Sequence, residues 1–262
     1  MNIIKAMYFS PTHTTEQIVQ QIAERLHGHL GYGVEKISIT KAAQRDKQYA
    51  LDKKDILVLG LPVYAGRIPA ITESTLKQLI GNNTPAVIVA VYGNRDYDDT
   101  LLEMKDMLSA QGFIIVAAGA FIGEHSFSYK LASSRPDGQD MLAASEFATQ
   151  TAKKLESIID DGNAENITVK GSNPYKKRAV TPAFAPKTKE SCNECMICYN
   201  ECPTGAISTD PKVADAQKCI RCCACVKSCP LDAKYFDNEI MLKSTIWLEE
   251  NFMPRKEPEI FI

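Results

Sequence analysis

The chain has 262 residues, of which 45% are hydrophobic and 24% are charged, and its formal net charge is −2. These values are ordinary for a globular protein, and so small a charge gives no reason to expect nucleic acid or an anionic membrane as a partner. No apolar run is long enough to span a bilayer, and the length predicts one sizeable domain followed by a small one.

Short apolar runs alternate with amphipathic segments through residues 1–161. Strands are predicted at 3–9, 34–39, 56–61, 85–92 and 113–121, and helices from Thr14 and near 72–80, 98–109 and 139–160. Thr14 and Gln17 have capping-box spacing at the start of the first helix. Five strands that alternate with helices predict an α/β fold with a doubly wound, five-stranded parallel sheet.

Three loops follow predicted strands, and in such a sheet the carboxyl ends of the strands form the ligand-binding edge. The first loop is rich in hydroxyl groups and opens onto a helix N-terminus, which suits a phosphate monoester. The other two each place an aromatic residue beside a glycine, which suits a flat ring. Together they predict a flavin mononucleotide (FMN) site, although purely structural packing of the tyrosines remains the alternative. The candidate residues are Ser10, Thr12, His13, Thr14, Thr15, Pro62, Val63, Tyr64, Ala65, Gly66, Tyr92, Gly93, Asn94, Arg95, Tyr97 and Asp98.

Eight of the nine cysteines form two runs with one spacing, each ending in Cys-Pro and displaced by 27 residues. This is the spacing of a bacterial-type ferredoxin with two [4Fe-4S] clusters, in which the fourth cysteine of each run binds the other cluster. The pattern predicts one cluster on Cys192, Cys195, Cys198 and Cys229, and one on Cys219, Cys222, Cys225 and Cys202. A zinc site would leave half of these thiols unused, and a disulfide framework would require a secreted chain. Cys223 fits neither run and is expected to be a small buried filler.

The rest of the chain is divided by composition. Residues 162–188 contain glycines and prolines without helical periodicity and predict a linker, whose basic run Lys176–Arg178 is expected to be solvated. Residues 189–237 form the predicted ferredoxin domain, and 238–262 a helix followed by a surface tail. Thiolate ligands and the absence of an apolar signal segment predict a reducing, cytoplasmic setting.

On these motifs the N-terminal region resembles a flavodoxin-type FMN domain, through the stretches SPTHTT, PVYAGRIP and YGNRDYDD. The whole chain resembles the flavodoxin–ferredoxin fusion proteins of anaerobic microbes, of the EFR1 type, also through Glu124–Ser128 and Arg135–Asp137. The resemblance implies that Ser10, Thr12, Thr14 and Thr15 hold phosphate, that Tyr64 and Tyr97 flank the isoalloxazine ring, and that Gly66, Gly93 and Asn94 contact its edge. One departure is His13, since flavodoxins usually have Gly-Asn in the middle of this loop.

The resulting functional expectation is an electron carrier that joins FMN to two [4Fe-4S] clusters and exchanges electrons with redox partner proteins. One alternative is a flavin-dependent reductase of a quinone, nitro compound or dioxygen, with a pocket closed by the 126–138 loop (Ser133, Ser134, Arg135, Gly138) and with His125 as a proton donor. Another is a redox-sensing module. No dinucleotide-binding fingerprint is present. The sequence does not set the oligomeric state, and a homodimer is compatible with it.

Overall fold

A computed structural model describes residues 2–161, 164–178, 180 and 182–262. Its main sheet has six strands in the order β2-β1-β3-β4-β5-β8. The strands are β1 (Ile3–Tyr8), β2 (Gly33–Ser38), β3 (Ile56–Pro62), β4 (Thr84–Tyr92), β5 (Phe113–Ile122) and β8 (Glu259–Phe261). The first five are parallel, and their order 2-1-3-4-5 is that of the doubly wound, flavodoxin-like fold.

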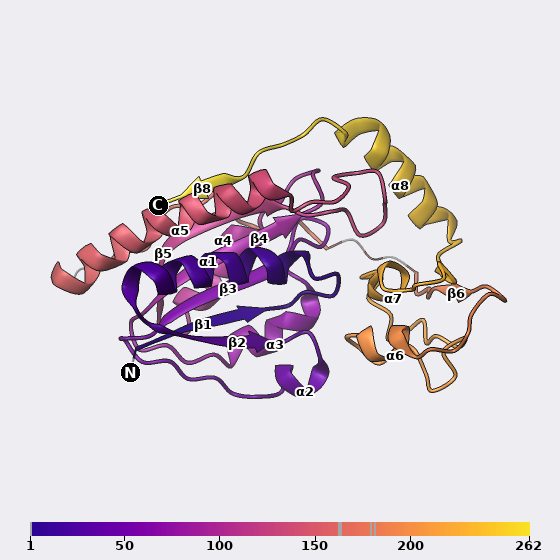
Figure 1. Cartoon of the computed structure of the whole chain (residues 1–262), viewed down its shortest axis with the longest axis horizontal. Coiled ribbons are helices and arrows are strands. Elements are labelled where there is room, and N and C mark those ends of the chain that lie inside the picture. The colour runs from indigo at the N-terminus through magenta and orange to yellow at the C-terminus, as the bar shows by residue number, and fades with distance from the viewer. Residues whose placement is uncertain (1, 162–163, 179, 181) are drawn as a thin grey trace.

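Helices cover both faces of this sheet, as Figure 1 shows. In the sheet domain they are α1 (Thr14–Leu30), α2 (Ala42–Arg45), the 3-10 turn η1 (Ala70–Thr72), α3 (Glu73–Lys77), α4 (Thr100–Ser109) and α5 (Gly138–Asp161). α1 and α5 pack on one face and α3 and α4 on the other. The five parallel strands and the helices 98–109 and 139–160 are therefore confirmed, whereas the predicted helix 72–80 is shorter than expected.

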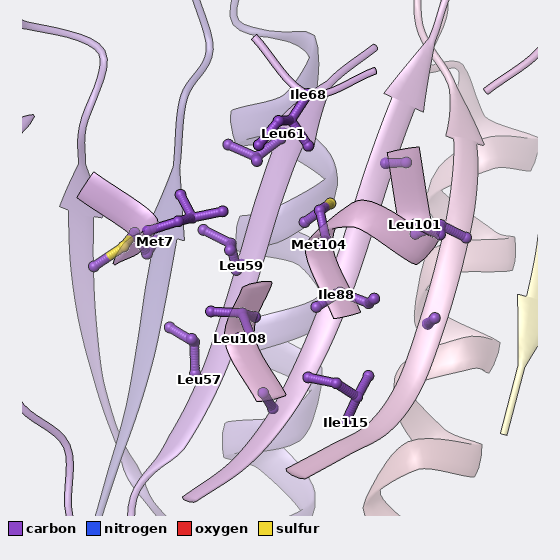
Figure 2. Close-up of a cluster of buried hydrophobic side chains, with 14 of the residues drawn as sticks. Met7, Leu57, Leu59, Leu61, Ile68, Ile88, Leu101, Met104, Leu108 and Ile115 are labelled. Atoms are coloured by element: carbon purple, nitrogen blue, oxygen red, sulfur yellow. The ribbon is translucent and has the colours of Figure 1, made fainter. Parts of the chain in front are cut away.

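The core lies on both faces of the sheet because strand side chains alternate in direction. Along β3, Leu57, Leu59 and Leu61 point to the α3/α4 face, and Figure 2 shows them beside Met104 and Leu108 of α4. All five side chains are fully buried. Burial of each contributes roughly 1.5–3 kcal/mol, so this face alone stabilises the domain substantially.

The predicted capping box at α1 is wrong. The helix begins at Thr14, and its N-cap residue His13 makes no side-chain cap bond. Ser10 Oγ instead accepts the backbone N–H of Glu16 at 3.0 Å. A residue four positions before the helix therefore caps it, because the loop turns back over the first turn.

Residues 164–178 of the predicted linker lie against the sheet domain, and its basic run is not simply solvated. Arg178 donates to Glu73 at 2.7 Å and to Glu103 at 3.2 Å. The backbone N–H of Lys176 donates to Asp99 at 2.6 Å. These carboxylates belong to α3, α4 and the residue before α4, so the expectation of a solvated run is corrected.

The cysteine region contains two short helices, α6 (Ile197–Glu201) and α7 (Ala224–Lys227). A two-stranded antiparallel ribbon joins β6 (Lys187–Thr188) to β7 (Lys234–Tyr235). Helix α8 (Glu239–Phe252) follows, as predicted, and the side chain of Asn238 caps its N-terminus. None of the helices in the described part of the chain is long and apolar enough to cross a membrane.

The last ten residues, 253–262, form a C-terminal strap that returns to the sheet domain (Figure 1). Its strand β8 pairs with β5, with Gly119 opposite Ile260. Asn94 holds the start of the strap, since its side-chain amide donates to the carbonyls of Phe252 at 2.5 Å and Pro254 at 2.9 Å. The predicted surface tail is thus a sixth, antiparallel strand, and it covers the edge that β5 would otherwise expose.

Candidate functional site

The eight predicted ligand cysteines line two separate pockets. The first pocket contains Cys192, Cys195, Cys198 and Cys229. The second contains Cys202, Cys219, Cys222 and Cys225. Each pocket therefore combines three cysteines of one run with the last cysteine of the other, which is the crossed arrangement that the spacing predicts.

The two pockets are built from equivalent positions of the 27-residue repeat. The backbone repeats as well: Glu194 and Arg221 have φ of 60° and 57°, and Met196 and Cys223 have φ of 64° and 61°. Met196 and Cys223 are the N-cap residues of α6 and α7. Cys223 is thus the counterpart of Met196 and not of a ligand, and its 2% exposure fits the predicted buried filler.

Backbone N–H groups aim at the crossing cysteines. Ala206 donates to Cys202 Sγ and Ala233 to Cys229 Sγ, each at 3.2 Å. Burial acts to raise the pKa of Cys202 and Cys229, but such hydrogen bonds outweigh it and lower both. Burial dominates at Cys222 and raises its pKa to about 12. Two thiols are therefore predisposed to the thiolate form, while Cys222 requires a bound metal to become one.

The donor set fits a four-iron cluster better than a single ion. Among the described residues, no three His, Cys, Asp or Glu side chains converge closely enough to hold one metal ion. A cubane cluster instead needs its thiolates spread over four iron corners, as four cysteines around one pocket allow.

A third pocket lies at the carboxyl ends of β1, β3, β4 and β5. It brings together parts of all three predicted loops and a fourth segment after β5. Its lining residues are Pro11, Thr12, Thr14, Thr15, Pro62, Val63, Tyr64, Val91, Tyr92, Gly93, Gly123, Glu124, His125, Ser126 and Cys222. We refer to it as the strand-end pocket.

The hydroxyl loop provides an anion site in this pocket. Thr14 and Thr15 begin α1, so their N–H groups have no intrahelical acceptor and the helix dipole favours negative charge there. Thr15 Oγ1 is buried without a hydrogen-bond partner, a feature that a phosphate oxygen would satisfy. The nearby carboxylate of Glu16 is occupied by Tyr8 at 2.7 Å and Gln20 at 2.9 Å.

His13 faces the cysteine region. Its Nδ1 lies 3.0 Å from Glu16, and its Nε2 lies 3.7 Å from Glu201 of α6. Its φ of 65° is in the left-handed region that favours glycine. The side chain thus links the phosphate loop to α6 and does not line the strand-end pocket.

Several residues that were predicted to contact the isoalloxazine ring do not line the strand-end pocket. Tyr97 is 1% exposed, donates to Glu259 of the strap at 2.6 Å and does not line the strand-end pocket, so its predicted place beside a flavin ring stays a prediction. Tyr92 lines the pocket in its place. The side chain of Asn94 holds the strap, and Gly93 is required because a Cβ would lie 2.3 Å from the ring of His125.

The second loop turns away from the pocket after Tyr64. Ala65 is exposed with a φ of 53°, and Gly66 lies against Asp98. Asp98 is paired with Arg95. These four predicted residues therefore build the loops and do not line the pocket.

The segment after β5 was only partly anticipated. His125 Nδ1 accepts the backbone N–H of Phe127 at 3.1 Å, which leaves the proton of the neutral ring on Nε2. Burial, followed by the charges of Lys227 and Arg95, lowers the pKa of His125 to about 4. At neutral pH this side chain is a hydrogen-bond donor and is not an acid. Glu124 and Ser126 belong to the stretch Glu124–Ser128 that carries part of the family resemblance, but they were not predicted as site residues, and their place after a parallel strand is the signal that indicates them.

The loop proposed as a substrate lid is held by neighbouring elements. Arg135 is paired with Asp140 and donates to the Lys256 carbonyl at 2.8 Å. Ser128 Oγ donates to Glu249 of α8 at 2.6 Å. The 126–138 loop is thus engaged by α5, α8 and the strap.

The second cysteine pocket adjoins the strand-end pocket. Cys222 lines both. Burial and then the thiols Cys222, Cys223 and Cys219 raise the pKa of Tyr64 well above its usual value, and Tyr64 lines the strand-end pocket together with Cys222. Lys227 of α7 joins the cysteine region to the segment after β5, since it donates to Glu124 Oε1 at 2.6 Å and to the Ser128 carbonyl at 2.8 Å.

Comparison with known proteins agrees with this division. Residues 185–208 match the family of 4Fe-4S binding domains. No curated protein matches the chain. Among solved structures, similar folds include a flavodoxin from the domain Archaea (12% identity, covering 60% of this chain and 99% of that one, TM-score 0.42). A Streptococcus pneumonia TIGR4 flavodoxin (18%, 58% and 99%, TM-score 0.42) is another.

A third is the rubredoxin oxygen:oxidoreductase of the anaerobe Desulfovibrio gigas (15%, 60% and 37%, TM-score 0.43). Likeness at this level says nothing about what the chain binds. The strand order and the family match carry the conclusion: the chain joins a flavodoxin-like domain to a ferredoxin-like region with a 4Fe-4S binding domain.

Proposed function

We propose that this protein transfers electrons between two [4Fe-4S] clusters and an FMN bound in the strand-end pocket. The single observation that carries the proposal is Cys222, a predicted ligand of the second cluster that also lines the strand-end pocket. FMN exchanges electrons singly or in pairs and each cluster exchanges one, so a flavin and clusters in adjoining sites can be coupled. The physiological setting would be anaerobic metabolism, with protein partners as donor and acceptor.

The lining of the strand-end pocket indicates which residues would hold FMN. Its phosphate would bind the N–H groups of Thr14 and Thr15 and the hydroxyls of Thr12 and Thr15, and its ring would lie near Tyr64 and Tyr92. The pocket encloses about 60 Å³. Typical small-molecule sites measure roughly 300–1,000 Å³, so binding of the whole cofactor requires lining side chains to move outward.

A carrier is favoured over a reductase of small acceptors by the contacts around the ring end. Lys227, Tyr129 and Glu249 tie the segment after β5 to α7 and α8. The cysteine region thus covers the side of the pocket that a small substrate would need. A sensing role would use the same sites without sustained electron flow.

The first test is the cofactor content of anaerobically purified protein, measured as iron, sulfide and acid-released flavin. The proposal expects about eight iron per chain and about one FMN after reconstitution. Reduction of the clusters in a stopped-flow instrument should then be followed by reduction of the flavin at a rate that is unchanged by tenfold dilution. A rate proportional to protein concentration would contradict transfer within one molecule, and eight iron without flavin would favour the sensing role.

The matched variants are Thr15→Val and Thr149→Val. The first removes the unpartnered hydroxyl of the anion site and is expected to weaken FMN binding at least severalfold. The second removes a hydroxyl of α5 that donates to the Ser145 carbonyl at 3.0 Å and lies 3.1 Å from His29 Nε2. Thr149 does not line the strand-end pocket, so this variant is expected to leave FMN binding unchanged.

A further inference from the structure

The two cysteine pockets are equivalent in backbone but differ in one charge. Five pairs of equivalent lining residues differ in type: Asn193/Ile220, Met196/Cys223, Ile197/Ala224, Thr204/Leu231 and Ile207/Lys234. Only the last pair places a charged side chain in a pocket wall. Lys234 lines the pocket of Cys192, and Ile207 occupies the same place in the pocket of Cys222.

Lys234 is buried and its hydrogen bonds go to neutral groups. The side chain is 3% exposed. Its Nζ donates to Thr188 Oγ1 at 2.7 Å and to the Pro211 carbonyl, and Pro211 lines the same pocket. A buried ammonium group without a carboxylate partner is costly unless negative charge lies nearby. The thiolates and the iron-sulfur core of a bound cluster would supply that charge.

The cations near the second pocket are in different surroundings. Lys227 is paired with Glu124 at 2.6 Å, which offsets its charge. Arg221 is partly solvated and stacks on Phe184 at 5.2 Å. Arg45 of α2 is buried and donates to the Pro203 carbonyl at 2.9 Å, and Pro203 lines the second pocket. None of the side chains of Lys227, Arg221 and Arg45 lines that pocket itself, whereas Lys234 lines the first.

Of three other factors that set cluster potentials, one is matched in the two pockets, one acts in the same direction as Lys234 and one, a neutral hydroxyl, opposes it. Each pocket has one matched N–H···S bond of 3.2 Å, from Ala233 and from Ala206. Cys195 is exposed, whereas Cys222 and Cys225 are buried, and water stabilises a reduced cluster. Thr204 Oγ1 lies 3.6 Å from Cys202 and acts in the opposite direction, but it is neutral and distant. Lys234 therefore dominates the difference.

We propose that Lys234 raises the reduction potential of the Cys192 cluster above that of the Cys222 cluster. The inference rests on the proposed function, since it requires two clusters. Each cluster takes up one electron without making or breaking a bond, and the added negative charge is stabilised by the buried ammonium group. The first electron would therefore settle on the cluster that shares no ligand with the strand-end pocket, so transfer from the Cys222 cluster to the Cys192 cluster would be thermodynamically downhill.

The test is an anaerobic redox titration followed by electron paramagnetic resonance and absorbance, with iron and sulfide measured on every sample. Wild-type protein should show two separated one-electron steps. Lys234→Gln keeps an amide donor for Thr188 and Pro211 but removes the charge. It should shift the higher-potential step to a more negative value, and by more than the lower step, because the charge of Lys234 also acts on Cys225 of the second pocket. Lys234→Arg keeps the charge and should leave that step near its wild-type position. Ile207→Met changes the equivalent position without charge and should shift neither step.

The outcomes separate the two proposals. Fewer than eight iron in the wild-type protein after reconstitution would overturn the two-cluster function itself. Eight iron with unshifted steps in Lys234→Gln would overturn only the role of Lys234. A negative shift in Lys234→Arg as large as that in Lys234→Gln would also overturn it, because the effect would then follow from packing and not from charge.

Discussion

The sheet domain and the cysteine region are stabilised in different ways. The sheet domain has two large hydrophobic clusters, one on each face of the sheet, and its residues 1–161 contain no cysteine. The buried cluster of the cysteine region consists of Cys198, Ile207 and Cys225, two of which are predicted ligands. The comparison teaches that apolar packing specifies the first fold, whereas the apolar core of the second is so small that we expect the proposed clusters to stabilise it.

Loss of a cluster should have the largest effect and should separate the two regions. Cys198→Ser removes a buried ligand and is expected to abolish at least one cluster and unfold residues 187–235, while the sheet domain stays folded. Hydrogen exchange measured by mass spectrometry would show fast exchange confined to the cysteine region. Cys223→Ser is the control, because Cys223 is not a ligand, and it should retain eight iron. Loss of iron from the control would contradict the ligand assignment.

A core substitution should have the converse effect. Leu59 is fully buried between β3 and α4 (Figure 2), so Leu59→Ala is expected to lower the free energy of unfolding of the sheet domain by about 2–5 kcal/mol. Leu142 is 59% exposed, and Leu142→Ala should change the free energy by less than about 0.5 kcal/mol. Chemical denaturation followed by circular dichroism measures both. Iron content per folded chain should be unchanged, and its loss would show that the regions do not fold separately.

Acid should destabilise the boundary between the regions through His125. The folded-state pKa of about 4 lies below the ordinary value of 6.5, so the unfolded chain binds the proton first as pH falls. Stability from this group is full above pH 6.5, falls by about 2 kcal/mol by pH 5 and continues to fall until about pH 4. In a plot of the free energy of unfolding against pH, His125→Gln should reduce the slope between pH 7.5 and 5. An equal slope in the variant would assign the acid sensitivity to other groups.

His13→Gly should have the smallest effect on stability, and it tests the contact between the sheet domain and α6 of the cysteine region. Glycine removes the cost of a positive φ, which offsets the loss of the Glu16 and Glu201 contacts, so the free energy of unfolding should change by less than about 1 kcal/mol. If His13 serves to join the regions, hydrogen exchange in α6 should become faster while FMN affinity stays within about threefold. Strongly weakened FMN binding would instead make His13 part of the phosphate site.

The sequence predicted what depends on local spacing. The cysteine runs determine both pockets because ligand geometry is set within a few residues, and the buried strands were evident from their apolar runs. The contacts that were not predicted involve distant partners. Tyr97 is engaged by Glu259, which lies 162 positions away, and Arg178 by Glu73 and Glu103. Such pairings follow from tertiary structure, and neither periodicity nor residue type announces them.

The C-terminal strap changes how the cysteine region is connected. β8 returns to the main sheet and pairs with β5, so both the residues before the cysteine region and those after it belong to the sheet domain. The cysteine region is therefore topologically an insertion and not an appendage. An appended module on one flexible linker can rotate freely, whereas an inserted one is tethered at both ends. The double tether limits the range of distances between the cluster sites and the strand ends, and it would do so even if every side-chain contact between the two regions were lost.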